Sequence, residues 1–503
     1  MIPPRVVRGF IARELDDCRD IKNLRKEALT REFSRLTPPP VFHTKPYRHQ
    51  LVAFLLGISY PRFLFFLDMG LGKTKVVLDL LRYYRDCGKM RRALVLVPNV
   101  ANMTEWKMQT ATHQPSMSVE NIERADYVHA QADVVVCNYQ RLAHLLSDKA
   151  RVGRHNKLVP NQEAIKEFAA NYDSLILDES TAIKNHLSLT HRIVRQLASR
   201  MRIVYALTGT PFGREPADLW PQFKVVDNGE TLGDTIGLFR EAFCKRVPAT
   251  FGFGFNYVFK ESMRAQLNRM IQHRSIQYST EDCVDLPERV FTRTPVILGV
   301  AGRDIYDGLR NRLRAEMADG EIVEASFARL RQAASGFTVV DGENVLIKDS
   351  QGKLDAISDV LDNTRCTTKI VVFHEFIFSG ETISQHLKSA KIRHVRLWSG
   401  TKDKEGVVRK FTTDPKCRVF VVNNQSGAFG LNLQVANYVL YYESPCSPIV
   451  RAQTEKRCHR VGQTKKVFYY DLVSRNTVDE RILAFLRQGR DLREEILRGK
   501  QVL

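Results

Sequence analysis

Two series of short apolar segments constrain the fold of this chain more than any other feature. The first series comprises residues 63–67, 93–97, 134–136, 175–177 and 203–207, and the second comprises residues 369–373, 394–397, 419–422, 438–442 and 467–470. Segments of strand length that are apolar on both faces suit buried parallel strands, and the amphipathic stretches between them suit crossover helices. The pattern predicts an α/β fold with two parallel-sheet lobes in tandem.

The texture of the sequence divides the chain into five parts. The charged start is helix-prone and ends in Thr37-Pro38-Pro39-Pro40, which stops a helix and stiffens a linker. The region between the two apolar series is Arg-rich and helix-prone, and it lacks regularly recurring apolar segments of strand length. We expect an N-terminal helical extension (1–40), a first lobe (41–235), a helical insertion or linker (236–345), a second lobe (346–485) and a C-terminal helical tail (486–503).

Charge and cysteine content narrow the class of protein. The 76 Lys and Arg residues exceed the 56 Asp and Glu residues by 20, and this surplus indicates an anionic partner, most commonly nucleic acid. A solvated basic surface or a lipid-facing patch would explain the same charge. Nine scattered cysteines without C-x-x-C spacing predict neither a disulfide framework nor a zinc ribbon. With no signal-peptide stretch at its start, the chain is expected to be cytoplasmic.

A glycine-rich segment follows the first predicted strand. Met69-Gly70-Leu71-Gly72-Lys73-Thr74 precedes an amphipathic stretch, so its backbone N–H groups and the helix N-terminus can face phosphate oxygens. Lys73 can reach the β- and γ-phosphates, and the Thr74 hydroxyl can bind Mg²⁺. The strict G-x-x-x-x-G-K-[ST] pattern has glycine where this chain has Leu67, so the loop is a variant. The alternative is a glycine-rich turn followed by a surface lysine.

A pair of carboxylates, Asp178 and Glu179, follows the buried segment 174–177. Carboxylates at the carboxyl end of a parallel strand are well placed for a metal and a water. Asp178 would hold Mg²⁺, directly or through water, and Glu179 would polarise the attacking water as a general base. The alternative for Asp178 is an ordinary helix cap at a strand-to-helix turn.

These residues form part of an ordered set that resembles the SNF2 (SWI2/SNF2) family of superfamily 2 helicases and translocases. In the first lobe the similar segments are Tyr47-Arg48-His49-Gln50, Asp68 to Thr74, Val97-Pro98-Asn99 with Trp106, Cys137-Asn138-Tyr139, Asp178-Glu179-Ser180-Thr181 with Ala182 to Asn185, and Leu207 to Pro211. In the second lobe they are Gly352 to Asp355, Val371 to Phe376, Gly427 to Leu433, and Gln453, Arg457, His459-Arg460 and Gly462-Gln463. The resemblance covers residues 41 to 480 and implies RecA-like lobes, as in a compact bacterial or phage member.

The resemblance also implies roles for individual residues. It assigns ATP binding to Gln50, Met69, Gly70, Leu71, Gly72, Lys73, Thr74, Gly430 and Gln453, and Mg²⁺ to Thr74 and Asp178. It assigns catalysis to Lys73, Asp178, Glu179, Arg457 and Arg460. Arg457 and Arg460 are spaced i, i+3, so one helical face could present both guanidinium groups to the γ-phosphate. Contacts to the nucleic-acid backbone are expected at Asn99, Asn138, Tyr139, Lys184, Asn185, Ser399, Gly400 and Asn424.

The implied function is a DNA-stimulated ATPase that moves along double-stranded DNA, with single-stranded DNA or RNA as alternative partners. A strand-separating helicase is the nearest alternative activity, and a non-hydrolysing DNA-binding scaffold is an alternative of another class. Three positions depart from the family pattern: Thr181 replaces the usual His, Lys456 the usual Asp, and Asn437 a common Asp. Because Lys73, Asp178, Glu179 and Arg460 are present, hydrolysis is expected, while its coupling to DNA contact is in doubt.

Overall fold

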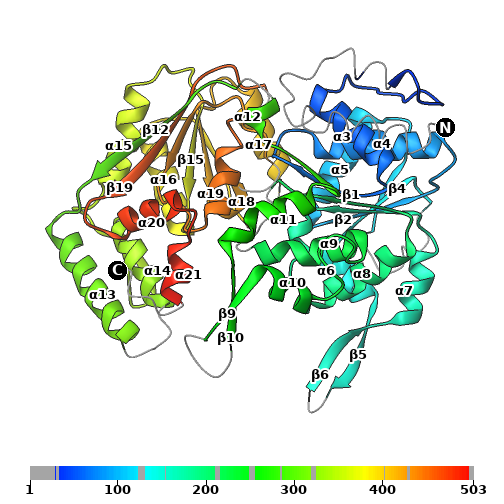
Figure 1. The fold of residues 1–503 in the computed structure, drawn as a ribbon. Coiled ribbons are helices and arrows are strands. Elements are labelled where there is room, and N and C mark those ends of the chain that lie inside the picture. Colours follow the sequence, from blue (N-terminus) through cyan, green and yellow to red (C-terminus); the bar gives the residue numbers. More distant parts are fainter. Residues whose placement is uncertain are drawn as a thin grey trace. The chain divides into compact units, whose positions relative to one another are not determined.

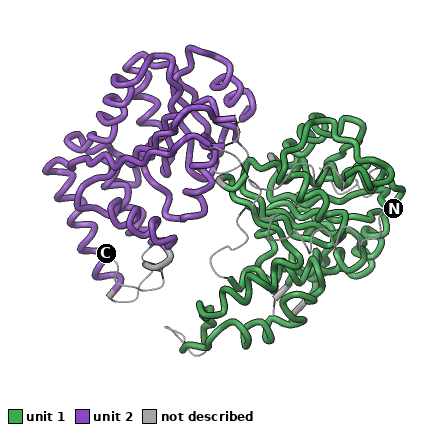
Figure 2. The backbone as a smooth tube through the Cα atoms, turned by 45° about the horizontal axis from the view of Figure 1, so that its top comes forward, with its two compact units in different colours: residues 1–284 green, residues 285–503 purple. Residues whose placement is uncertain are grey.

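Two parallel β-sheets organise the chain, one in each of two compact units. A computed structural model describes residues 29, 33–122, 131–152, 155–209, 216–248, 255–283, 286–318, 324–401, 403–427, 431–460 and 462–497. The first unit comprises residues 1–284 and the second comprises residues 285–503 (Figures 1 and 2).

The first unit contains a seven-stranded parallel sheet in the order β11-β1-β8-β7-β2-β4-β3. Its strands are β1 (Arg62–Leu67), β2 (Ala93–Val97), β3 (Val119–Asn121), β4 (Val134–Asn138), β7 (Ser174–Asp178), β8 (Ile203–Leu207) and β11 (Ser275–Tyr278). Strands β1, β2, β7 and β8 are almost completely buried, because helices cover both faces of the sheet.

Two hydrophobic clusters fill the space between this sheet and its helices. One face packs against α3 (Arg48–Ser59), α4 (Lys73–Asp86) and α5 (Val100–His113). The other packs against α6 (Tyr139–Leu145), α7 (Gln162–Ala169), α8 (Leu189–Arg200), α9 (Leu219–Asp227), α10 (Ile236–Phe243) and α11 (Arg264–Ile271). Short 3₁₀ helices cover Ser180–Ile183, Pro216–Asp218 and Glu261–Met263, and α12 covers Thr280–Cys283. The hairpins β5 (Ser147–Val152)–β6 (His155–Pro160) and β9 (Cys244–Pro248)–β10 (Phe255–Phe259) project from this unit (Figure 1).

The second unit contains a six-stranded parallel sheet in the order β12-β19-β18-β15-β17-β16. Its strands are β12 (Arg289–Val296), β15 (Ile370–His374), β16 (His394–Leu397), β17 (Val419–Asn423), β18 (Tyr438–Tyr441) and β19 (Val467–Ser474). The helices are α13 (Val300–Ala318), α14 (Glu324–Ala334), α15 (Gly352–Asp362), α16 (Ile377–Ser389), α17 (Lys404–Thr413), α18 (Asn424–Gly427), α19 (Pro448–Glu455), α20 (Val478–Arg487) and α21 (Leu492–Leu497), and a hairpin joins β13 (Phe337–Val340) to β14 (Glu343–Leu346).

The predicted fold class is confirmed, and all ten apolar segments coincide with strands of the two sheets. The structure differs within the region 236–345, which contains strands as well as helices. Strand β11 pairs with β1 in the first sheet, and β12 pairs with β19 in the second. Both are edge strands, β11 has only four residues, and most of β12 is exposed, so neither shows the continuous apolar run of a central strand.

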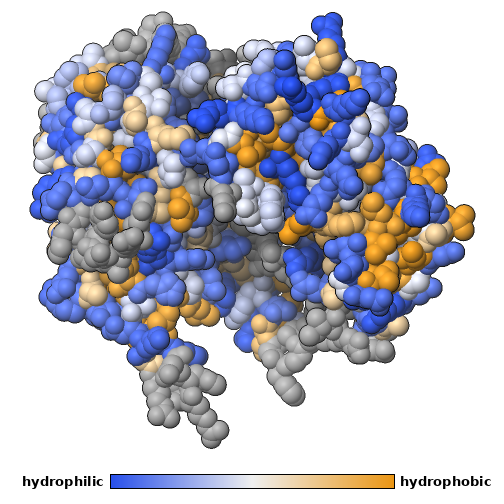
Figure 3. Space-filling view, turned by 180° about the vertical axis from the view of Figure 1, so that it is seen from behind, coloured by the Kyte–Doolittle hydropathy of each residue, from blue (hydrophilic) through white to orange (hydrophobic). Residues whose placement is uncertain are grey.

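The surface of the described residues is mainly polar. Hydrophilic side chains cover most of the face drawn in Figure 3, and hydrophobic ones gather at its right-hand edge, on the second unit. Exposed hydrophobic side chains of that unit include Ile297 and Val300, which are 69% and 79% exposed. None of the helices in the described part of the chain combines the length and the apolar character needed to cross a membrane.

Candidate nucleotide-binding and catalytic site

The glycine-rich loop connects the end of β1 to the start of α4. Gly70 and Gly72 have φ values of 87° and 76°, a left-handed conformation that side-chain-bearing residues rarely adopt. A Cβ atom added at Gly72 would lie 2.3 Å from Nε2 of Gln50. The loop therefore favours glycine at this position, and it leads directly into a 14-residue helix whose first N–H groups can bind an anion.

Helix α3 holds the loop from behind through two adjacent side chains. Gln50 donates from Nε2 to the Leu71 carbonyl at 3.0 Å and accepts from the Tyr47 amide at 3.0 Å. Nε2 of His49 lies 2.9 Å from the same Leu71 carbonyl. Burial lowers the pKa of His49, which keeps the ring neutral. Gln50, assigned to ATP binding by the family resemblance, thus fixes the backbone of the loop.

Lys73 occupies the first turn of α4, and its ammonium group turns back into the loop. Nζ donates to the carbonyl oxygen of Leu67 at 2.8 Å. Its charge also favours the ionised form of Asp178, on the next strand but one in the sheet. Lys73 and the half-buried Thr74 beside it are the first two residues of α4.

Asp178 ends strand β7 and is held by two donors. Oδ2 accepts from the indole Nε1 of Trp106 at 2.8 Å, and Oδ1 accepts from the backbone N–H of Glu179 at 3.1 Å. Burial and, after it, the nearby charge of Glu179 raise the pKa of Asp178 to about 6, although Trp106 and Lys73 act in the opposite direction. A cation beside this carboxyl group would favour its ionised form.

Glu179 adopts a backbone conformation that is unusual for a residue with a side chain. Its φ of 48° and ψ of 60° lie in the left-handed region, which costs about 1 kcal/mol for such a residue. Its Oε2 accepts from the Thr208 hydroxyl at 3.4 Å, at the end of β8. Tyr139 donates from its hydroxyl to the Asp178 carbonyl at 2.9 Å. These contacts orient the two carboxylates from neighbouring elements.

The residues around Asp178 fit a magnesium ion. A hydroxyl and a carboxylate are hard oxygen ligands of the kind that Mg²⁺ prefers. Within the described ranges, no group of three or more His, Cys, Asp or Glu side chains could hold a metal ion. A magnesium ion at Thr74 and Asp178 would therefore take its other ligands from phosphate oxygens and water, as this ion commonly does.

The arginines of the second unit lie beyond a helix, not on it. Helix α19 ends at Glu455, and residues 456–460 form turns, so the expected presentation of Arg457 and Arg460 on one helical face is wrong. The Leu433 amide donates to the Arg457 carbonyl at 3.1 Å, and Gln463 donates from Nε2 to three carbonyls at 2.9–3.2 Å. These hydrogen bonds accompany the end of the helix before residues 456–460.

The two arginines differ in exposure. The Arg457 side chain is buried, whereas Arg460 is partly exposed and donates from a terminal guanidinium nitrogen to the Leu431 carbonyl at 3.4 Å. Gln453 is half-buried in the last turn of α19. Gly430, assigned to ATP binding, lies outside the described residues. Arg460 is therefore the more accessible cation of the pair.

The expected nucleic-acid contacts fall into two groups. Asn99 and Asn138 cap α5 and α6 by accepting from backbone amides at 3.1 and 2.7 Å, as polar residues at helix starts often do. Nζ of Lys184 lies 3.7 Å from a carboxylate oxygen of Asp218. The remaining exposed members of this first group are Asn185, Ser399 and Gly400. These six residues lie at least partly on the surface.

Tyr139 and Asn424 form the second group, because both side chains are buried. Burial holds the pKa of Tyr139 well above its usual value, and its hydroxyl contacts Asp178 instead of solvent. Asn424 donates from Nδ2 to Oε2 of Glu375 at 2.7 Å and to the Glu443 carbonyl at 3.0 Å. Neither side chain faces solvent, so neither lies where a nucleic-acid phosphate could reach it directly.

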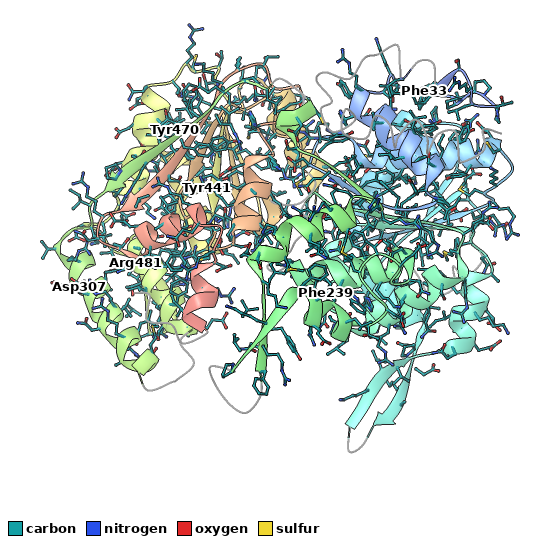
Figure 4. The ribbon with its side chains drawn as sticks, in the orientation of Figure 1. Phe33, Phe239, Asp307, Tyr441, Tyr470 and Arg481 are labelled. Atoms are coloured by element: carbon teal, nitrogen blue, oxygen red, sulfur yellow. The ribbon has the colours of Figure 1, made fainter. Side chains whose placement is uncertain are left out.

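Sequence reasoning missed the buried polar groups of the second unit. Glu443 accepts from the Ser379 hydroxyl at 2.6 Å and from the Glu375 amide at 2.8 Å, and burial raises its pKa. The Arg451 guanidinium lies 3.6 Å from the ring centroid of Tyr441, in the interior of this unit (Figure 4). A signal was present in the sequence, since Glu443 directly follows the apolar segment 438–442, as Asp178 follows the segment 175–177.

Comparison with family models identifies both halves of the chain. Residues 47–334 match the SNF2-related domain, and residues 352–462 match the helicase conserved C-terminal domain. The fold and the glycine loop with its carboxylate pair define a P-loop protein with two parallel-sheet units. The chain belongs to the SNF2 family.

Its similarity to individual proteins is distant but extends over most of the chain. It is 23% identical to the uncharacterized ATP-dependent helicase MG018 of Mycoplasma genitalium, covering 86% of this chain and 40% of that protein. It is 22% identical to the putative ATP-dependent helicase/translocase YwqA of Bacillus subtilis, covering 86% and 46%. A SWI2/SNF2 ATPase core of Sulfolobus solfataricus, solved with double-stranded DNA, is 20% identical with a TM-score of 0.41, covering 92% of this chain and 95% of that one. The chain spans less than half the length of these two curated relatives.

Proposed function

We propose that this chain hydrolyses ATP to ADP and phosphate in a DNA-stimulated reaction and uses it to move along double-stranded DNA. The observation that carries the proposal is the Asp178–Glu179 pair beside the glycine loop, with Lys73 close enough to favour ionised Asp178. Membership in the SNF2 family supports the same activity. We infer that the protein acts inside the cell, in the cytoplasm.

Each residue of the first unit has a defined task in this proposal. The loop amides and Lys73 bind the phosphates, and Thr74 and Asp178 hold Mg²⁺, which neutralises negative charge on the phosphates when it is bound. Glu179 accepts a proton from the attacking water, and its strained backbone and the Thr208 hydroxyl hold its carboxylate in one orientation. Trp106 positions Asp178 by donating to one carboxylate oxygen.

The second unit supplies positive charge. Arg460, with Arg457 beside it in sequence, stabilises the charge that develops on the transferred phosphoryl group. Gln453 contributes to nucleotide binding, and Gly430 is assigned to it by the family resemblance alone. Phosphate contacts carry no base information, so we expect movement that does not depend on DNA sequence.

The exposed residues are the candidates for DNA contact. Support for Asn99, Asn138, Lys184, Asn185, Ser399 and Gly400 comes from their partial or full exposure. A partner with regularly spaced phosphates also suits the net charge of +20. Single-stranded DNA and RNA present the same charged groups and are the alternatives that the experiments below separate from duplex DNA.

Strand separation is the second candidate, because two relatives carry the word helicase in their names. A tracking assay on duplex DNA, run beside an unwinding assay on a forked duplex, separates the two activities. Tracking without unwinding supports the translocase, whereas efficient unwinding favours the helicase.

Replacing Lys73 tests hydrolysis itself. We expect Lys73→Ala to abolish DNA-stimulated phosphate release while leaving salt-sensitive DNA binding largely intact, because the lysine serves the phosphates of the nucleotide. Phosphate release and DNA binding should be measured on the same preparation. Equal turnover by the variant and the wild type would contradict an active motor and favour a non-hydrolysing scaffold.

A further inference from the structure

A hollow of about 410 Å³ opens on the second unit, away from the residues assigned to ATP. It lies between the end of α16, the start of β16 and the end of α17. Its wall includes Lys388, Lys391, Arg393, His394, Lys410 and Asp414. The hollow is thus strongly basic, and three elements (α16, β16 and α17) and two connections contribute to it.

Four cations face a single carboxylate in this hollow. Lys388, Lys391, Arg393 and Lys410 are all exposed, and in the described part of the chain no ion pair joins any of them to a carboxylate. Asp414 accepts from the Lys416 amide at 2.8 Å. With His394 neutral, the wall carries three more positive than negative charges, so an anionic ligand is favoured.

Lys391 is held in a conformation that favours glycine. Its φ is 56°, at the point where α16 ends with the Ile392 amide bonded to the Leu387 carbonyl at 2.8 Å. Glycine is the usual residue at such a helix end, and another residue there costs roughly 1 kcal/mol. A lysine in this position gives up stability and adds a positive charge to the wall of the hollow.

The loop after α17 does not neutralise these cations. Lys369 donates from Nζ to the carbonyls of Phe411 and Asp414, both at 2.6 Å, and to that of Cys417 at 2.8 Å. Those carbonyl oxygens point toward Lys369, so they are not available to Lys388, Lys391 or Lys410. The positive potential of the hollow therefore stays open to a ligand from solvent.

We propose that this hollow binds backbone phosphates of a nucleic acid, as a contact separate from the residues that bind ATP. The inference extends the proposed function, because it presupposes that the chain acts on nucleic acid. Lysine ammonium groups are mobile point charges, and they suit repeated phosphates better than one ligand of fixed geometry. Strand β16 begins at the hollow, since its first residue, His394, is part of the wall.

The experiment compares two triple variants that each remove three positive charges from the second unit. Lys388→Gln, Lys391→Gly and Lys410→Gln change the hollow. Lys348→Gln, Lys404→Gln and Arg409→Gln change exposed residues outside its wall and serve as the matched control. Binding of a fluorescent DNA duplex without ATP is measured over a series of salt concentrations.

For the hollow variant we expect affinity to fall roughly tenfold at about 0.1 M salt, and the slope of log K against log salt to decrease by about 2 to 3. The control should keep the wild-type slope. Equal slopes for the two triple variants would overturn the proposal. The single variant Lys391→Gly distinguishes lost binding from lost folding. Its melting temperature should equal or exceed that of the wild type, while its slope of log K against log salt should decrease by about 1.

A second arm distinguishes nucleic acid from a free phosphate compound. Inorganic tripolyphosphate should compete with the duplex on the wild type and compete less on the hollow variant. Loss of tripolyphosphate binding with unchanged duplex binding would overturn the nucleic-acid assignment. Phosphate release by the hollow variant at saturating DNA should stay at the wild-type level. A failure of the proposed phosphate contact can therefore be distinguished from a failure of the proposed ATPase activity.

Discussion

The two units share a parallel-sheet architecture but use the carboxyl ends of their strands differently. In the first unit, Asp178 and Glu179 stand beside a loop that favours glycine at position 72. In the second, Glu443 and Asn424 follow strands in the same way, yet both are buried and take part in hydrogen bonds within the unit. The same fold thus supports an ionisable, strained site in one unit and a closed polar network in the other.

This difference teaches that position at a strand end does not by itself define a catalytic group. Asp178 has a raised pKa and a neighbouring lysine, and Glu179 has a left-handed backbone. Glu443 also has a raised pKa, but its carboxylate accepts from Ser379 and the Glu375 amide. We infer that the first unit carries the acid–base chemistry and that the second contributes arginine charge.

The largest expected effect is the loss of ATP turnover when Arg460 is replaced. It separates the arginine charge of the second unit from the acid–base chemistry of the first. Arg460→Ala should lower the rate of ATP turnover about 10³- to 10⁵-fold, because arginine stabilises charge mainly in the transition state. Affinity for ATP should stay within a few-fold of the wild type, whereas Lys73→Ala weakens it. Arg409→Ala, an exposed arginine of α17, is the control. If Arg460→Ala lost as much affinity for ATP as Lys73→Ala, the proposed division of tasks between the two units would be contradicted.

Glu179→Gln should lower turnover about 10²- to 10⁴-fold with ATP binding retained, because the amide cannot accept a proton from water. The matching change in the second unit is Glu443→Gln, which alters a buried carboxyl group of the other strand-end network. Single-turnover phosphate release compares the two. If Glu443→Gln slowed chemistry as much as Glu179→Gln in a folded protein, the distinction between the units would fail.

Removing the buried asparagine Asn424 of the second unit should lower stability more than removing the helix-capping asparagine Asn99 of the first. Asn424→Ala removes the donor to Glu375 and to the Glu443 carbonyl in a fully buried place, so it should lower the free energy of unfolding by about 2–3 kcal/mol. Asn99→Ala removes a helix cap and should cost about 1 kcal/mol. Denaturant unfolding measures both, and equal losses would contradict the comparison.

Replacing Asp178 should change the free energy of unfolding by a smaller amount, and this change should depend on pH. Its pKa is about 6 in the folded protein and about 3.9 in an unfolded chain, so the folded state binds more protons between these values. Stability should therefore fall as pH rises from about 4 to 6, and the penalty remains above pH 6. Asp178→Asn should be more stable than the wild type at pH 7 by about 1–2 kcal/mol, with the difference vanishing near pH 4. A gain that did not depend on pH would contradict this.

The sequence predicted the sheets well because central parallel strands carry a strong and local signal. Most of the ten segments are apolar on both faces, which favours a buried strand; residues 394–397, an edge strand that includes His394 and Arg396, are an exception. Strands β11 and β12 were missed because they lie at sheet edges, where pairing depends on contacts with distant residues. Edge strands with exposed side chains resemble connecting segments in sequence.

The site could be predicted only as far as local motifs reach. Spacing placed Lys73, Thr74 and Asp178, but the bond from Trp106 to Asp178 joins residues 72 positions apart and has no local signature. The i, i+3 spacing of Arg457 and Arg460 suggested a helix, which ends at Glu455 because Gln463 and Leu433 bind the following backbone. Tyr139 and Asn424 could not be recognised as buried from their motifs alone.

The central claim is that nucleic acid stimulates hydrolysis of ATP by this chain. Phosphate release by the wild type should be measured with duplex DNA, single-stranded DNA, RNA and no nucleic acid, at equal nucleotide concentrations. We expect duplex DNA to give the greatest stimulation, and Lys73→Ala to show none. Turnover that is the same in all four conditions, or absent in all four, would contradict the account.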